Sequence, residues 1–126
     1  IHPDFCVAVD VTHAKAPDTG SGRQAKLGGG PQIGMGPNMT RWMTRRMLEK
    51  ARELGIPHDV EVMEGHTGTN GWHMQTVREG IATSVVSLPL RYMHSPVETL
   101  ALEDLESTAA LLAAFAQGLG KEAERT

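Results

Sequence analysis

Asp10 and His94 are an acidic and an imidazole group that follow apolar, strand-like runs, where they could take part in ligand or metal binding. Asp10 follows the apolar run FCVAV, and His94 comes a few residues after IATSVVSLP. A carboxylate oxygen and an imidazole nitrogen are both groups that can bind a metal ion. On these residues alone a simpler interpretation is favoured, because strand-end aspartates often bond the next turn and most histidines satisfy local hydrogen bonds.

Other motifs that could carry chemistry lack a needed partner. The histidines do not form H-E-x-x-H, and His66 and His73 are seven positions apart with no acid between them. The glycine-rich GGGPQIGMGPN does not match a phosphate-binding loop, which argues against a nucleotide. Its glycines are expected to let the backbone approach a strand or a substrate. The arginine-rich segment 41–52 is expected to be a solvated face, ion-paired by Glu49 and Glu53.

Composition narrows the partners and the compartment. The chain has 126 residues and a net charge of -3, which favours one domain and argues against non-specific binding to nucleic acid. Its single cysteine, Cys6, cannot form an internal disulfide and fits a reducing compartment. No apolar run approaches the roughly 20 residues of a membrane span. Cytoplasm is therefore the expected location, with no membrane partner.

Strand and helix patterns alternate along the chain. Helix 39–54 repeats apolar residues every three or four positions, with Asn38 as its expected cap and Gly55 as its stop. The segment between the first strand and this helix should be a long irregular loop, and the tail 120–126 should fray. Alternation of this kind predicts an α/β fold, with helices packed on a mostly parallel or mixed sheet. The expected strands are 5–10, 58–63 and 81–90, and the other expected helices are 70–80 and 102–119.

Four motifs, in this order and at these separations, carry a family resemblance. VAVDVTHA, GGGPQIGMGPN, GHTGTNG and VVSLPLRYMHSPVE resemble the C-terminal part of the catalytic domain of dinuclear metallo-aminopeptidases. This family includes glutamyl, deblocking and tetrahedral aminopeptidases, some of them labelled cellulase or endoglucanase. The similarity runs from Phe5 to Gly118. Residues 1–126 are therefore expected to be one segment of such a domain, without its upstream half and its inserted domain.

The resemblance implies a site shared with the upstream half. Two divalent ions, zinc or cobalt, would lie together, with Asp10 holding one and His94 the other. The remaining ligands and the glutamate base would precede Ile1, so the chain alone is expected to be inactive. If both ligands serve one site, their side chains should lie within about 8 Å, beside the glycine loop 28–36.

The resemblance also implies peptide substrates, a cytoplasmic enzyme and a homo-oligomer. One departure is Asn70 of GTNG, which stands where the family has an acid and loses its charge. Two other functions remain open. A glycoside hydrolase needs two facing carboxylic acids about 5 to 9.5 Å apart, and no second acid pairs with Asp10 in the sequence. A non-catalytic binding or assembly module is the third possibility.

Overall fold

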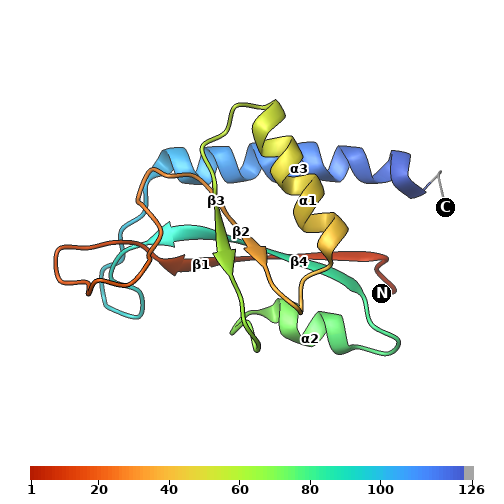
Figure 1. Ribbon diagram of the computed structural model, residues 1–126, viewed down its shortest axis with the longest axis horizontal. Coiled ribbons are helices and arrows are strands. Elements are labelled where there is room, and N and C mark those ends of the chain that lie inside the picture. The colour runs from red at the N-terminus through yellow and green to blue at the C-terminus, as the bar shows by residue number, and fades with distance from the viewer. Residues whose placement is uncertain (124–126) are drawn as a thin grey trace.

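A computed structural model describes the backbone of residues 1–123 and the side chains of residues 1–120. Helices α1 and α3 lie on one face of a sheet and α2 on the other, as Figure 1 shows. The predicted α/β class is confirmed. In chain order the elements are β1 (Phe5–His13), β2 (Gln32–Met35), α1 (Arg41–Glu53), β3 (Asp59–Val62), α2 (Asn70–Thr76), β4 (Ala82–Leu90) and α3 (Leu102–Ala123).

The four-stranded sheet has the order β1-β4-β2-β3. β1 and β4 are parallel and in register over their whole length, from Phe5 opposite Ala82 to His13 opposite Leu90. β3 is parallel to β2, but β2 runs antiparallel to β4, so the sheet is mixed. As a result, the ends of β1 and β4 share one edge of the sheet with the beginnings of β2 and β3.

Two clusters of buried side chains hold the layers together. Consecutive residues of a strand point to opposite faces, so Val85 and Val86 of the central strand serve different clusters. The larger cluster fills the space between the sheet and helices α1 and α3, and the smaller one lies on the opposite face. The larger contains Ile33, Met43, Met47, Ala51, Val86, Leu111 and Phe115, and the smaller contains Ala8, Met39, Met63 and Val85.

Several boundaries differ from those predicted. β1 continues to His13, and β2 lies inside the segment that was predicted to be irregular. Helix α2 ends at Thr76, before the glycine that was expected to stop it. Helix α3 continues to Ala123, through part of the tail that was predicted to fray, and the rest of the tail lies outside the described residues.

The cap of α1 is Thr40 rather than the predicted Asn38. Thr40 makes no side-chain cap bond, because its Oγ1 accepts a hydrogen bond from the backbone N–H of Thr83 at 2.9 Å. The amide of Asn38 instead donates to the carbonyl oxygen of Gly65. Gly55 ends the helix as predicted, with φ +65°. In the described part of the chain, no helix is both long enough and apolar enough to cross a bilayer.

Candidate functional site

The parallel pair β1 and β4 brings the two predicted metal ligands toward the same edge of the sheet. Asp10 lies within β1, three residues before its last residue, His13, which is opposite Leu90 at the end of β4. At about 3.3 Å per residue, Asp10 is about 10 Å from the end of its strand. His94 lies four residues beyond Leu90. Asp10 is therefore inside the strand, not at its end as the sequence suggested.

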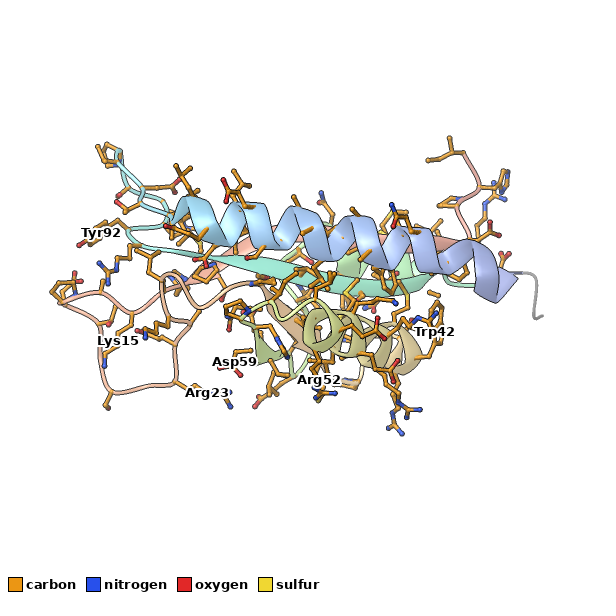
Figure 2. The ribbon with its side chains drawn as sticks, turned by 90° about the horizontal axis from the view of Figure 1, so that it is seen from above. Lys15, Arg23, Trp42, Arg52, Asp59 and Tyr92 are labelled. Carbon is orange, nitrogen blue, oxygen red and sulfur yellow. The ribbon has the colours of Figure 1, made fainter. Side chains whose placement is uncertain are left out.

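A short closed loop carries His94. Arg91 and Thr99 form a bridge through two backbone hydrogen bonds of 2.9 and 3.1 Å, which closes residues 92–98 into a loop. Figure 2 labels Tyr92, which begins this loop, at the end of the molecule where β1 and β4 finish.

Backbone strain marks the position of His94. Tyr92 and His94 have φ values of +62° and +65°, which bulky residues rarely adopt. The backbone N–H of His94 donates to Oε1 of Glu98 at 2.9 Å, and this bond helps to hold the conformation. Backbone strain of this kind is concentrated at functional sites. The imidazole is exposed, so its ring nitrogens are available to a ligand.

Asp10 keeps one carboxylate oxygen available. Its Oδ1 accepts a hydrogen bond from the backbone N–H of Val11 at 2.8 Å, and no bond to Oδ2 is present among the described residues. Because side chains alternate along the strand, Asp10 points to the same face as Ala8, which is the face that α2 covers. A half-buried carboxylate with one oxygen unbonded fits the role of a metal ligand.

A complete metal centre does not form within the described residues. No group of three or more His, Cys, Asp or Glu side chains converges there. A stable zinc site needs three or four protein ligands. The donor types of Asp10 and His94 fit divalent ions, and their role as ligands stays a prediction.

A polar pocket of about 440 Å³ opens beside the last residues of β1. The hydroxyl of Thr12 donates to Oε1 of Glu61 at 2.6 Å, across the face of the sheet. The other oxygen of Glu61 is buried and has no hydrogen-bond partner among the described residues. Thr12 lies two residues after Asp10 and points to the same face, about 7 Å away along the strand. Thr12 and Glu61, which line this pocket, therefore form a polar contact on the face of the sheet to which Asp10 points.

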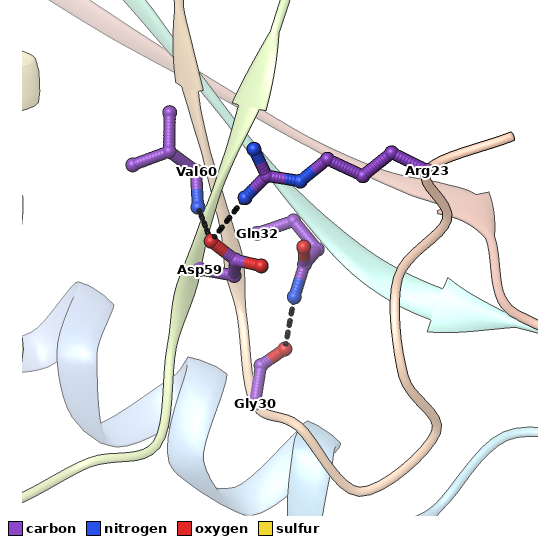
Figure 3. Close-up of polar contacts among 5 residues, drawn as sticks. All are labelled: Arg23, Gly30, Gln32, Asp59 and Val60. Carbon is purple, nitrogen blue, oxygen red and sulfur yellow. Dashed lines mark hydrogen bonds and ion pairs between the residues drawn. The ribbon is translucent and has the colours of Figure 1, made fainter.

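An ion pair ties the loop after β1 to the first residue of β3. Figure 3 shows the guanidinium of Arg23 donating to Oδ1 of Asp59 at 2.9 Å, where the backbone N–H of Val60 also donates. The hydrogen bond from Val60, followed by that from Arg23, holds the pKa of the Asp59 carboxyl below its ordinary value. Both side chains are more than half exposed, so this pair contributes little stability by itself.

The glycine loop 28–36 is anchored by a carboxylate that sequence reasoning missed. Asp104, in the first turn of α3, is 1% exposed and accepts hydrogen bonds from the backbone N–H groups of Gly28 and Gly30, at 2.9 and 2.8 Å. A side chain on Gly30 would also overlap the carbonyl of Pro57. Gly30 therefore lets the backbone pass closely by the segment before β3, whereas the prediction was an approach to a strand or a substrate.

Asn70, the departure from the family motif, is exposed and begins α2. The preceding Thr69 caps this helix by accepting a hydrogen bond from the backbone N–H of Gly71 at 3.1 Å. Gly71 packs closely against Ala8 and Val85. Asn70 therefore lies on the face of the sheet to which Asp10 points.

The chain is similar to known aminopeptidases over most of its length. The family model of M42 glutamyl aminopeptidase matches residues 1–111. A lysyl aminopeptidase of Pyrococcus furiosus is 40% identical over 119 residues, which are 94% of this chain and 34% of that protein. The chain thus spans about a third of the length of its curated relatives.

Solved structures show the same similarity. A TET aminopeptidase from a marine sediment archaeon of the Thaumarchaeota matches with a TM-score of 0.76 and 26% identity, over 87% of this chain and 32% of that one. The TET1 peptidase of Pyrococcus horikoshii, which can assemble into a tetrahedron or a large octahedral shell, matches with a TM-score of 0.69 and 33% identity, over 90% of this chain and 33% of that one.

Proposed function

Because the chain belongs to the M42 glutamyl aminopeptidase family, we propose that it forms the C-terminal part of a catalytic domain that removes N-terminal residues from peptides. The observation that carries this proposal is the family match over residues 1–111, which includes both predicted ligand positions. The parallel pairing of β1 and β4, which directs Asp10 and His94 toward one edge of the sheet, supports it.

The proposed activity depends on two divalent ions, zinc or cobalt. Asp10 would hold one ion and His94 the other, with the remaining ligands and the general base supplied by parts of the protein outside this chain. Such a pair of ions supplies a water of lowered pKa and polarises the peptide carbonyl. The residues of this chain orient the ligands: the closed loop 92–98 fixes His94, and the sheet fixes Asp10.

Asn70 and the polar pocket beside β1 provide contacts for a peptide. An asparagine offers both an amide donor and a carbonyl acceptor, where an acid would attract the substrate's ammonium group by charge. We therefore expect a weaker electrostatic preference for the substrate's N-terminus than an acid at this position would give.

The complete enzyme is proposed to be a cytoplasmic homo-oligomer, and the isolated chain to be inactive. The shells formed by the TET1 peptidase of Pyrococcus horikoshii support the oligomer. Inactivity follows from the incomplete ligand set, because a lone ligand for each ion gives neither a stable zinc site nor a positioned base.

The first prediction concerns the two ligands in the complete protein. Asp10→Asn and His94→Ala should each lower kcat for peptide amides by at least about 100-fold, since changing even an outer partner of a metal ligand costs about 10- to 100-fold. Each variant should also lose bound metal, measured by atomic absorption.

The controls are Asp18→Asn and His2→Ala, which change exposed residues outside the site and should leave both readouts unaltered. An Asp10→Asn or His94→Ala variant that keeps its full metal content and rate would refute the assignment. Hydrolysis of cellulose substrates without release of amino acids would instead favour the glycosidase.

A further inference from the structure

A second pocket lies where β2 ends. This is the opposite end of the strands from the candidate metal ligands. The volume of the pocket is about 660 Å³. Because β2 runs antiparallel to β4, the residues that follow β2 lie beside the first residues of β4, far from Leu90 and the His94 loop. Figure 2 shows Trp42, in the first turn of α1, and Tyr92 at opposite ends of the molecule. The main lining side chains are Met35, Met39, Arg41, Thr44, Arg45 and Leu48.

Two arginines give this pocket a positive charge. Arg41 and Arg45 are four residues apart on α1, so they lie on the same side of the helix. Neither forms an ion pair within the described residues, although the sequence predicted a face paired by Glu49 and Glu53. Instead, Glu53 pairs with Lys50 at 2.6 Å. The first turn of α1 contains no acidic residue, so the helix dipole adds to the positive potential.

Apart from the arginines and Thr44, the side chains that line the pocket are apolar. Met35 is 43% exposed at the end of β2, and its register partner Val62, 66% exposed on the edge strand, extends this apolar surface. Leu48 closes the pocket from the next turn of α1. Thr44 is not available to a ligand as a donor, because its hydroxyl donates to the carbonyl oxygen of Gly34 at 2.9 Å. A ligand for this pocket therefore combines an anionic end with an apolar body.

We propose that this pocket binds the C-terminal carboxylate of a peptide whose last side chain is apolar. The planar guanidinium groups match a carboxylate in a forked, bidentate geometry. A single apolar side chain can occupy the space beside Met35 and Leu48, because ligand pockets of about 300 to 1,000 Å³ hold groups of this size. An inorganic phosphate would satisfy the arginines but would leave the apolar wall in water.

Binding of an N-blocked peptide to the purified protein tests this proposal. The probe is N-acetyl-glycyl-leucine, whose blocked N-terminus separates this pocket from the proposed aminopeptidase site. Calorimetry should show binding of the free acid. The C-terminal amide of the same peptide should bind about tenfold more weakly or worse, because charge-assisted bonds to carboxylate are roughly twice as strong as neutral ones.

Variants locate the site. The double change Arg41→Gln and Arg45→Gln should weaken binding of the acid by about tenfold or more. Arg52→Gln, an exposed arginine on the same helix but outside the pocket, should leave it unchanged. Circular dichroism checks that each variant is folded, and the comparison of acid with amide on the unaltered protein needs no variant.

Four results would overturn the proposal. These are equal affinity for acid and amide, an equal loss in Arg52→Gln, no binding at millimolar concentration, and inorganic phosphate binding as tightly as the peptide. The last result would make the pocket a simple anion site. Aminopeptidase activity in the variants Asp10→Asn and His94→Ala tests the proposed metal site, which lies at the other end of the strands. The two proposals can therefore fail independently.

Discussion

Single residues hold the loops around the candidate site, and Asp104 shows how. Its carboxylate is buried at the start of α3, yet it is satisfied by two backbone N–H groups of the glycine loop. Burying a charge is tolerated only when hydrogen bonds replace its water. The N-terminus of α3 also favours a negative charge in its first turn. Asp104 therefore connects the loop 28–36 to the helix that packs on the sheet.

We expect Asp104→Ala to lower the free energy of unfolding by about 3 kcal/mol. The change removes both acceptors and leaves the N–H of the buried Gly30 without a partner, and each such bond to a charged group contributes about 1.5 to 3 kcal/mol. Urea denaturation measures the loss. Glu103→Ala, at the exposed neighbouring position, is the control and should change stability by less than about 0.5 kcal/mol. Equal losses in the two variants would show that the buried contacts are unimportant.

At the scale of elements, the sequence predicted those strands and helix ends that have a local signal, such as an apolar run or a terminating glycine. The apolar run at 81–90 predicted β4, which is buried along almost its whole length, and Gly55 predicted the end of α1. β2 was missed because its four residues lie among glycines and prolines, and because its pairing with β4 is a long-range contact. The cap at Thr40 was missed for a related reason, since its hydroxyl bonds a distant strand.

Some features of the candidate site have a signal in the sequence and others have none. Motif resemblance selected Asp10 and His94 as predicted ligands, and their role stays a prediction. The pairing of β1 with β4 directs both residues toward one edge of the sheet. The left-handed backbone of His94 has no sequence signal, because histidine does not require it. The contact between Thr12 and Glu61 also had none, because it joins residues on opposite edge strands of the sheet.

The segments that follow β2 and β3 pass each other closely at Gly36, and a substitution there tests this contact. A side chain at Gly36 would overlap the carbonyl group of Met63, whose N–H donates to the carbonyl of Met35 at 2.8 Å. Backbone atoms cannot move aside as a flexible side chain can, so Gly36→Ala should destabilise the fold by about 2 kcal/mol or more. The control is Gly22→Ala, where nothing lies within 4 Å. Thermal unfolding that is the same for both variants would contradict this packing.

At the scale of the whole molecule, the sheet has open edges and partly covered faces. β4 is hydrogen-bonded on both sides, whereas β1 is an edge strand of nine residues. Val9, in the middle of β1, is 51% exposed. Long edge strands with exposed apolar side chains invite pairing with another chain. The similar proteins are about three times as long as this chain, so their folds contain further segments that could cover such an edge.

We therefore expect the 126-residue chain, prepared alone, to self-associate and to bind a hydrophobic dye. Light scattering and dye fluorescence measure the two effects. Val9→Lys should reduce both, because a charge on an edge strand opposes pairing of that edge. Val62→Lys on β3 is the matched control, because Val62 is 66% exposed. It should have the smaller effect, because β3 has four residues to pair and β1 has nine. A monomeric chain without a dye response would show that β1 needs no neighbour. A larger effect of Val62→Lys would show that self-association occurs through β3 instead of β1.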